Sequence, residues 1–148
     1  MPEERVLLLS VRPRFARAIL AGTKTVEVRR RSVQARPGTR VIIYASNPTM
    51  AVVGTARLLV ALTCDPDAAW AYHERGLGLH RHEFDAYLAG SKACLLLLDE
   101  VTSLDTPISL DELRRSGDFR PPQSYRYLSP SDPEQVLVLG RPGSLSGG

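Results

Sequence analysis

Hydrophobic positions near the start of the chain recur with two spacings, first helical and then extended. The apolar run Val6–Val11 predicts a short strand. Pro13 suits the first turn of a helix, because its missing N–H would have no partner there, and Phe15 and Ile19 follow at helical spacing on one face. Gly22 then ends the predicted helix at a position that favours a left-handed backbone. This stretch therefore predicts a strand followed by an amphipathic helix.

Residues 25–31 change to a period of two, which is typical of a strand. Val26 and Val28 fall on one face together with Arg30, and a sheet can bury the two valines. The opposite face would carry Thr25, Glu27, Arg29 and Arg31. Lys24 lies at the turn just before this strand, so a carboxylate and several cations crowd one side of it. We interpret this density of charge as a functional site.

Three further apolar runs predict strands, at Thr39–Ser46, Met50–Leu62 and Lys92–Val101. Gly54 lies inside the second of these runs, and a glycine within a strand often marks a bulge or a bend of a barrel. The segment Pro121-Pro-Gln-Ser-Tyr125 suits neither a helix interior nor a central strand, because its two prolines lack the N–H that both require. Five strands are therefore predicted along the chain.

Helices are predicted between and after these strands. Asp65-Pro66-Asp67 begins a helix that carries Trp70 and Tyr72, and we expect both aromatic residues in the core. A second helix spans about His80–Leu88. The segment Ser109-Leu-Asp-Glu112 has the spacing of a capping box and begins another short helix.

This arrangement predicts an α+β fold, either a small mixed β-barrel or a strongly curved sheet, with helices packed against it. The elements do not alternate as they do in a doubly wound fold, and no glycine-rich phosphate loop follows a strand. We expect residues 1–140 to form a single domain and residues 141–148, rich in glycine and serine, to form a flexible tail.

The length and composition limit the class of protein. The chain has 148 residues, which fits one domain with a core of its own. No apolar run approaches the roughly 18 residues that a membrane-spanning helix requires, and Met-Pro-Glu-Glu-Arg at the N-terminus lacks the parts of a secretory signal. We interpret Cys64 and Cys94 as reduced core residues. We therefore expect a cytoplasmic protein with no membrane partner.

The charge is distributed unevenly along the chain. Residues 1–40 contain ten Lys and Arg against three Glu, whereas residues 41–148 contain nine against thirteen Asp and Glu. An excess of cations of this kind suits a polyanionic partner such as nucleic acid, because phosphate contacts supply most of the sequence-independent affinity. A plain solvated basic surface is the alternative interpretation.

Short motifs occur along the chain in a specific order. They are Ser10-x-x-Pro13, Gly22-x-Lys24-x-x-Glu27-x-Arg29-Arg30, Tyr44-Ala-Ser-x-Pro48, Gly54 and Pro121-Pro-Gln-Ser124. Over about residues 5–130 this series resembles the ASCH domain, and it is most similar to small free-standing prokaryotic ASCH proteins with a Pro-Pro-Gln-Ser signature. The resemblance implies a PUA-like β-barrel, a group associated with RNA and modified bases. It also implies a ligand cleft between the first helix and the barrel, lined by Lys24, Glu27 and Arg29.

Two activities are known among proteins that this chain resembles. One ASCH branch hydrolyses the acetyl amide of acetylcytidine nucleosides, and other members have been linked to ribonuclease activity. The amidohydrolase branch places a threonine nucleophile three residues after its motif lysine, where this chain has Glu27. A carboxylate can act as a general base on water but cannot form the acyl-enzyme that a hydroxyl forms, so the resemblance carries this activity over less directly.

Several side chains are candidates for the site, each with a structural alternative. If the protein is an enzyme, Lys24 and Glu27 are the predicted catalytic pair. The alternatives are that Lys24 is a solvated turn residue and that Glu27 forms a structural salt bridge with Arg29. The predicted ligand-binding residues are Ser10, Arg12, Lys24, Arg29, Arg30, Tyr44, Ser46, Asn47, Gln123 and Ser124. Arg14, Arg17 and Arg31 are further candidates for phosphate contacts.

No cofactor and no metal site are predicted. His80 and His82 are two residues apart on a helix and therefore point about 200° apart, which makes a poor chelate. We expect a protein that binds RNA, DNA or a nucleotide in a basic cleft, with the cations on phosphate and Tyr44 and Gln123 on a base. The rival hypotheses are a hydrolase of a modified nucleoside or of RNA, and a protein-interaction module. The oligomeric state stays open.

Overall fold

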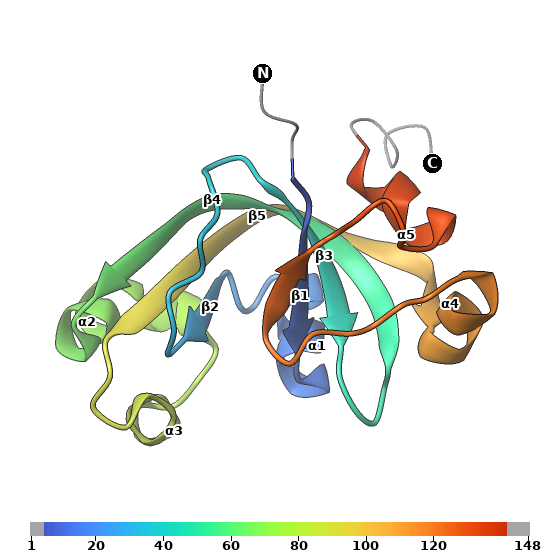
Figure 1. The fold of residues 1–148 in the computed structure, drawn as a ribbon. Helices are drawn as coiled ribbons and strands as arrows, with labels where there is room; N and C mark the ends of the chain where they lie inside the picture. The colour runs from blue at the N-terminus through green and yellow to red at the C-terminus, as the bar shows by residue number, and fades with distance from the viewer. Residues whose placement is uncertain (1–4, 142–148) are drawn as a thin grey trace.

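In the described part of the chain, six strands form one mixed sheet that curls into half of a barrel (Figure 1). The computed structural model describes residues 5–141. The strands are β1 (Leu7–Val11), β2 (Val26–Arg29), β3 (Arg40–Ala45), β4 (Ala51–Cys64), β5 (Ala93–Ser109) and β6 (Tyr125–Tyr127). They lie side by side in the order β2-β5-β4-β3-β1-β6. β1 and β3 are parallel, and all other neighbouring pairs are antiparallel.

Within residues 5–141, five helices cover the sheet. They are α1 (Pro13–Ala21), α2 (Pro66–Leu77), α3 (Arg81–Leu88), α4 (Leu110–Ser116) and α5 (Glu134–Leu137), and a 3-10 turn follows at Val138–Gly140. Figure 1 shows α2 and α3 at one end of the half-barrel, α4 and α5 at the other, and α1 between them below the strands. The predicted α+β class, with helices against a curved sheet, is confirmed.

The long strand β4 bends where the sheet curls. Its pairing with β5 shifts register between Val52 and Gly54 and twice more along the strand, as expected for a strand that changes direction. A Cβ atom on Gly54 would lie 2.6 Å from a side-chain carbon of Leu20 on α1 and 2.6 Å from the carbonyl oxygen of Thr102 on β5. The register shift shows that the bulge predicted at Gly54 is present. The absence of a side chain at Gly54 lets Leu20 of α1 pack closely against the sheet.

The two edge strands of the sheet, β2 and β6, do not pair with each other within residues 5–141. The connection after β2 lies across β6 instead. The Gln34 N–H donates to the hydroxyl oxygen of Tyr125 at 3.3 Å, and the hydroxyl of Tyr127 donates to the Gln34 carbonyl. The sheet therefore curls without closing through strand pairing, and side chains and a loop span the opening.

Three apolar clusters make the core. α1 contributes Ala16 and Ile19 to the largest cluster, which fills the curl of the sheet with residues such as Leu9. α2 and α3 bury their apolar faces against Val26 and Val28 of β2. The third cluster lies under α4 and α5, and its members include Leu8, Ile42 and Phe119.

The structure corrects two sequence predictions. Tyr72 was expected in the core, but its exposed fraction is 84 %, and only Trp70 packs inward, with its ring centroid 5.4 Å from that of Phe84. The sheet has a sixth strand, β6, directly after the proline segment. Apart from Arg141, the predicted tail lies outside the described residues. No helix in the described part of the chain has both the length and the apolar character needed to cross a bilayer.

Candidate functional site

One cleft gathers the side chains that the sequence predicts as catalytic or ligand-binding. It has a volume of about 840 Å³ and lies between α1, the edge strand β2, the end of β3, α3 and the segment 121–124. Its lining includes both predicted catalytic residues, Lys24 and Glu27, and every predicted ligand-binding residue: Ser10, Arg12, Arg29, Arg30, Tyr44, Ser46, Asn47, Gln123 and Ser124. The fold therefore brings together residues that are more than a hundred positions apart in the chain.

Lys24, Glu27 and Arg29 form a buried ion triad in the floor of the cleft. Lys24 Nζ lies 3.4 Å from Glu27 Oε1, and Arg29 Nη2 lies 2.8 Å from Glu27 Oε2. The exposed fractions of the three residues are only 1 %, 6 % and 8 %. One carboxylate therefore compensates two cations that water scarcely reaches.

Short local structure places Lys24 in this position. Gly22 adopts a left-handed backbone with φ of 84° and ends α1 by donating to the carbonyls of its last turn. The chain then turns back along the helix into β2, and Lys24 extends under the ring of Phe15, with Nζ 4.9 Å from the ring centroid. Its ammonium also donates to the carbonyl oxygen of Leu77 at 2.5 Å. Burial lowers the pKa of Lys24, and the nearby Glu27 carboxylate only partly offsets this effect.

Arg29 connects the two edges of the half-barrel. Its Nη2 donates to the carbonyl oxygen of Ser10 at 2.6 Å, and its Nη1 donates to Ser124 Oγ at 3.1 Å. Ser10 holds the same segment by a second route, since its hydroxyl donates to the Pro122 carbonyl at 2.7 Å and its N–H donates to the Ser124 carbonyl at 2.9 Å. Arg29 therefore links β2 to β1 and to the residues before β6.

The rim of the cleft carries cations of a different kind. Arg12, Arg30 and Arg31 are exposed, and within residues 5–141 none of the three has a carboxylate at ion-pair distance. Arg14 differs, because it holds Glu83 of α3 through two contacts of 2.5 and 3.0 Å. That hydrogen-bonded partner lowers the pKa of Glu83 to about 2. Three guanidinium groups at the rim therefore remain available to an anionic ligand.

Neutral polar groups complete the lining. Tyr44, Ser46 and Asn47 lie at the end of β3, where a register shift between Ile43 and Tyr44 changes the direction of the strand. Burial raises the pKa of Tyr44, so its hydroxyl is protonated at neutral pH and can donate a hydrogen bond. The side chain of Gln123 is exposed on the opposite wall. An amide and hydroxyl groups around a cleft suit the mixed donors and acceptors of a nucleobase edge.

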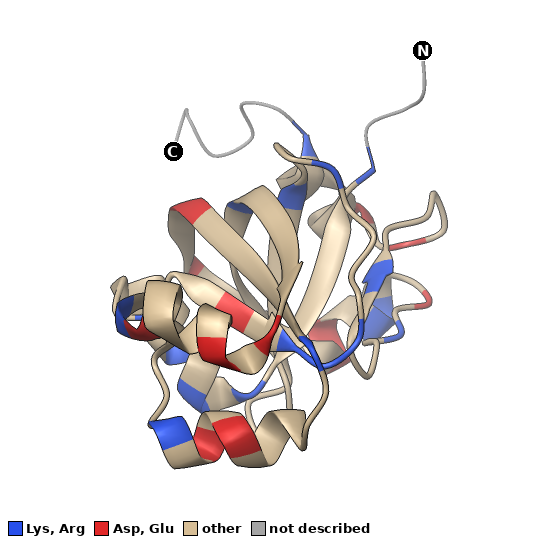
Figure 2. Ribbon diagram, turned by 90° about the vertical axis from the view of Figure 1, so that its left-hand side faces the viewer, with Lys and Arg blue, Asp and Glu red and all other residues tan. Residues whose placement is uncertain are grey.

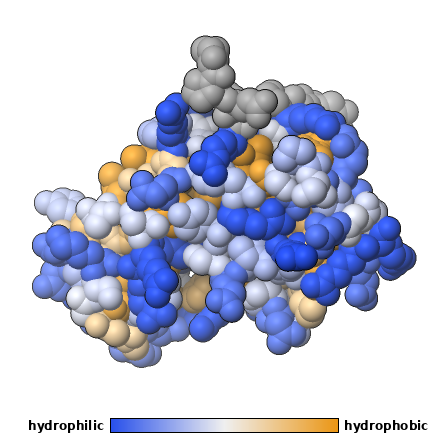
Figure 3. Space-filling view, viewed as in Figure 1, coloured by the Kyte–Doolittle hydropathy of each residue, from blue (hydrophilic) through white to orange (hydrophobic). Residues whose placement is uncertain are grey.

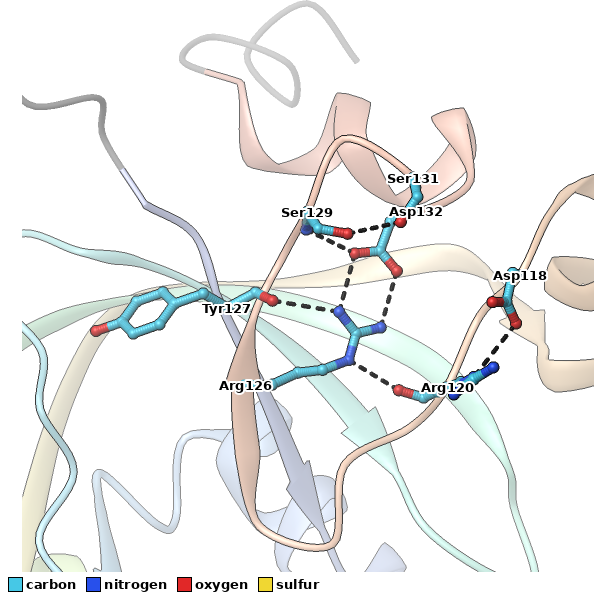
Figure 4. Close-up of polar contacts among 7 residues, drawn as sticks. All are labelled: Asp118, Arg120, Arg126, Tyr127, Ser129, Ser131 and Asp132. Atoms are coloured by element: carbon cyan, nitrogen blue, oxygen red, sulfur yellow. Dashed lines mark hydrogen bonds and ion pairs between the residues drawn. The ribbon is translucent and has the colours of Figure 1, made fainter.

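A hydrogen-bond network around Arg126 holds the wall of the cleft that carries Gln123 and Ser124 (Figure 4). Arg126 holds Asp132 through two contacts of 2.8 and 2.9 Å, and it also donates to the carbonyls of Arg120 and Tyr127. Burial on its own would raise the pKa of Asp132, but hydrogen bonds from Arg126 and from the backbone of Ser129 outweigh it and lower the pKa. This network fixes both ends of the segment 121–124.

Some of the lining was not expected from the sequence. α3 contributes Glu83 and Tyr87, and Met50 and Leu110 lie at the other end of the cleft. Glu83 and Tyr87 are four residues apart and so share one face of the helix, while Phe84 and Leu88 form the buried face. The helical spacing was readable in the sequence, but nothing local indicates that the polar face meets α1.

The charge on the molecular surface is not uniform. Figure 2, which views the molecule from the side of α2 and α3, shows Lys and Arg interspersed with Asp and Glu on the helices nearest the viewer. Figure 3 shows a mainly hydrophilic face, hollowed in its lower half between the α3 side and the central strands. Arg17, a further candidate for phosphate contact, is exposed but does not line the cleft.

Comparison with known proteins identifies the family. A family model described as "Domain of unknown function (DUF365)" matches residues 7–117. A protein of Zymomonas mobilis named "ASCH domain-containing ribonuclease" is 33 % identical over 141 residues, which cover 94 % of this chain and 95 % of the relative. The chain belongs to the ASCH domain family.

The solved ASCH structures agree with this membership. The crystal structure of ASCH from Zymomonas mobilis matches with a TM-score of 0.83 at 32 % identity, covering 94 % of this chain and 98 % of that chain. Structures of a Tyr-to-Phe and a Ser-to-Ala variant of that protein match with TM-scores of 0.81 and 0.83, at 32 % and 31 % identity. They cover 91 % and 95 % of this chain and 98 % and 100 % of theirs. The ASCH fold therefore extends through β6 and α5, beyond the residues that the family model matches.

Proposed function

We propose that this ASCH protein binds RNA in the cleft and cleaves it there. The observation that carries the proposal is the combination of three unpaired arginines at the rim with neutral hydrogen-bonding groups inside, over the buried ion triad. Cations without a carboxylate partner suit phosphate, and amide and hydroxyl groups suit a base or a ribose. The relative named as a ribonuclease supports RNA as the substrate.

The cations divide into two roles in this proposal. Arg12, Arg30 and Arg31 contact phosphates along the bound strand, because they are exposed and unpaired. Lys24 and Arg29 instead shape the floor, since the Lys24 ammonium and both terminal nitrogens of Arg29 already contact Glu27, Ser124 or backbone carbonyls. The floor still lends positive potential to the cleft, because the triad has one more cation than it has carboxylates.

Cleavage of a phosphodiester needs a group that removes a proton from the attacking oxygen and one that donates a proton to the leaving oxygen. The sequence assigns this pair to Lys24 and Glu27, which the triad holds beneath the surface. Tyr44 and Ser124 line the cleft and have hydroxyl groups, and they are residues of the same two types as those changed in the crystallised variants of the relative. We therefore add both hydroxyl groups to the candidates for proton transfer.

Charge reversal tests the binding. Arg30→Glu should weaken binding of a short single-stranded RNA about tenfold or more at moderate salt and reduce the slope of log K against log salt by about one, because it removes a phosphate contact and adds repulsion. Fluorescence anisotropy over a salt series measures both effects. Arg17→Glu makes the same change of charge outside the cleft and should change the affinity far less. Equal effects of the two variants, or no binding by the wild type, would contradict the proposal.

A cleavage assay separates the two candidate sets of catalytic groups. Labelled RNA and DNA of the same sequence are incubated with the wild type and with Tyr44→Phe, Ser124→Ala and Glu27→Gln, and the products are separated on gels. We expect RNA to be cleaved and cleavage to fall in the first two variants while their RNA affinity stays near that of the wild type. If only Glu27→Gln lost activity and remained folded, the Lys24 and Glu27 pair would be the catalytic one.

A further inference from the structure

Helix α3 forms a wall of the cleft with one aromatic side chain directed to its rim. Tyr87 lines the cleft and has an exposed fraction of 37 %, so part of its side chain is accessible to a ligand. Its neighbours on the helix, Phe84 and Leu88, supply the buried face. Phe84 and Leu88, rather than Tyr87, are therefore the residues of α3 that lie in the apolar core.

The ring of Tyr87 contacts the guanidinium group of Arg30, which has no carboxylate partner within residues 5–141. The guanidinium carbon of Arg30, which follows β2, lies 5.2 Å from the centroid of the ring. Arg30 also lines the cleft. A flat guanidinium group over an aromatic ring is an attractive contact, and each of these planes can also stack on a nucleobase.

The position of α3 is fixed by a second contact at the cleft. Glu83, one turn before Tyr87 on the same helical face, holds Arg14 of α1 through two hydrogen bonds. This ion pair spans the cleft between α1 and α3. It therefore holds the ring at a defined place at the rim, which a stacking contact requires because its strength depends on the distance between planes.

We propose that Arg30 and Tyr87 form a base-stacking subsite for single-stranded RNA, separate from the groups at the end of β3 that would meet the nucleotide at the reaction centre. In this subsite a base stacks on the exposed surface of the Tyr87 and Arg30 pair, and the guanidinium also contacts the adjacent phosphate. The subsite rests on the proposed function and adds a nucleotide next to the one inside the cleft. It discriminates single strands from duplexes, because bases within a duplex already stack on one another.

The test compares RNA that has bases with RNA that lacks them. Probes are a labelled short oligoadenylate and an abasic ribose–phosphate oligomer of equal length, and the affinity of each is measured by anisotropy for the wild type, Tyr87→Phe and Tyr87→Leu. Stacking on one aromatic side chain strengthens binding about fivefold to 100-fold. We expect Tyr87→Leu to lose a factor in this range for oligoadenylate and almost nothing for the abasic probe, and Tyr87→Phe to behave as the wild type.

Each other outcome has a defined meaning. Equal losses of affinity for both probes would show that Tyr87 acts only through the position of α3, and no loss for either would also overturn the subsite. Failure of the wild type to bind any probe would instead contradict the proposed function itself. Tyr72→Leu, a change of the same type on the exposed side of α2, is the matched control and should leave both affinities unchanged.

A second readout does not depend on affinity. RNA that contains thiouridine is irradiated in complex with the wild-type protein, and the crosslinked peptides are identified by mass spectrometry. Crosslinks to the α3 peptide that contains Tyr87 are expected. Their absence, with crosslinks only to the segment 121–124 and the end of β3, would place the bound strand away from α3 and overturn the proposal.

Discussion

Glu27 is the single carboxylate between two buried cations, and the chemistry of the cleft floor depends on it. A charge removed from water is unfavourable unless a partner of opposite charge and further hydrogen bonds compensate it. Lys24 and Arg29 both receive that compensation from Glu27, at 3.4 and 2.8 Å. Arg29 has no other carboxylate partner within the described residues, and its Nε is buried without a hydrogen-bond acceptor there.

We therefore expect the main effect of Glu27→Gln to be a loss of stability. It should lower the free energy of unfolding by about 3 kcal/mol, because an uncompensated buried charge remains when one partner of such a pair is removed. Urea unfolding followed by circular dichroism measures the change. Glu83→Gln, which breaks the exposed pair with Arg14, is the control and should change stability little. Wild-type stability of Glu27→Gln, together with lost cleavage, would instead assign Glu27 to catalysis.

The sequence predicts the direction of these side chains and offers the pair of Glu27 with Arg29, but it does not predict the partners from distant segments. Alternation along residues 25–31 places Glu27 and Arg29 on one face, and the structure has them there. Whether they face solvent or pair with each other depends on groups that arrive from far along the chain. The Leu77 carbonyl accepts from Lys24 and Ser124 accepts from Arg29, and no pattern in residues 24–31 predicts these contacts.

At the scale of elements, Leu20 of α1 and the β5 backbone approach Gly54 of β4 too closely to leave room for a side chain there. Gly54→Ala should destabilise the protein by roughly 2 kcal/mol or more, because the new Cβ would lie 2.6 Å from a backbone oxygen that cannot move alone. Thermal unfolding of Gly54→Ala measures the effect. Gly117→Ala is the matched control, since its Cβ would have ordinary contacts of 3.5 Å and longer and its backbone is extended. Equal melting temperatures of the two variants would contradict this account.

The elements that the sequence predicts well are those with a long or strongly periodic pattern. Their order up to α4 agrees with the structure. β6 has only three residues, which is too short to show a period, and it takes its place through pairing with β1. Trp70 and Tyr72 were both assigned to the core, yet residues two apart on a helix point about 200° apart, so only one of them can face inward.

At the scale of the whole molecule, the Arg126 and Asp132 network couples acidity to folding. The pKa of Asp132 is lowered from its ordinary value of 3.8, so its contribution to stability is complete above that value and is lost as the pH falls through the lowered pKa. Asp132→Asn should lower the stability at neutral pH by roughly 2 kcal/mol, since it removes charge-assisted hydrogen bonds. Thermal unfolding at a series of pH values measures this difference.

The same series contains its own control. The difference between wild type and Asp132→Asn should shrink as the pH falls below the ordinary aspartate pKa and through the lowered one. The carboxyl becomes protonated first in the unfolded chain and then in the folded protein, where it is neutral like the amide. A difference that stayed constant over the whole pH range would show that shape, rather than charge, holds the segment 121–124.

The uneven charge along the chain predicts a basic region but not a cleft. Ten of the nineteen Lys and Arg lie within residues 1–40, and Arg12, Arg30 and Arg31 among them reach the rim. The opposite wall comes from residues 121–124, and the outer wall comes from α3. Pairing of strands that are distant in sequence creates this neighbourhood, and such pairing is not visible in local spacing.

The contact between Ser10 and Pro122 joins positions 112 residues apart, which has a consequence for biosynthesis. A ribosome makes the arginines first and the opposing wall last, so an emerging polypeptide has no finished binding surface until almost all of it has been translated. Under the proposed function, RNA binding in the cleft would therefore follow near-completion of the chain.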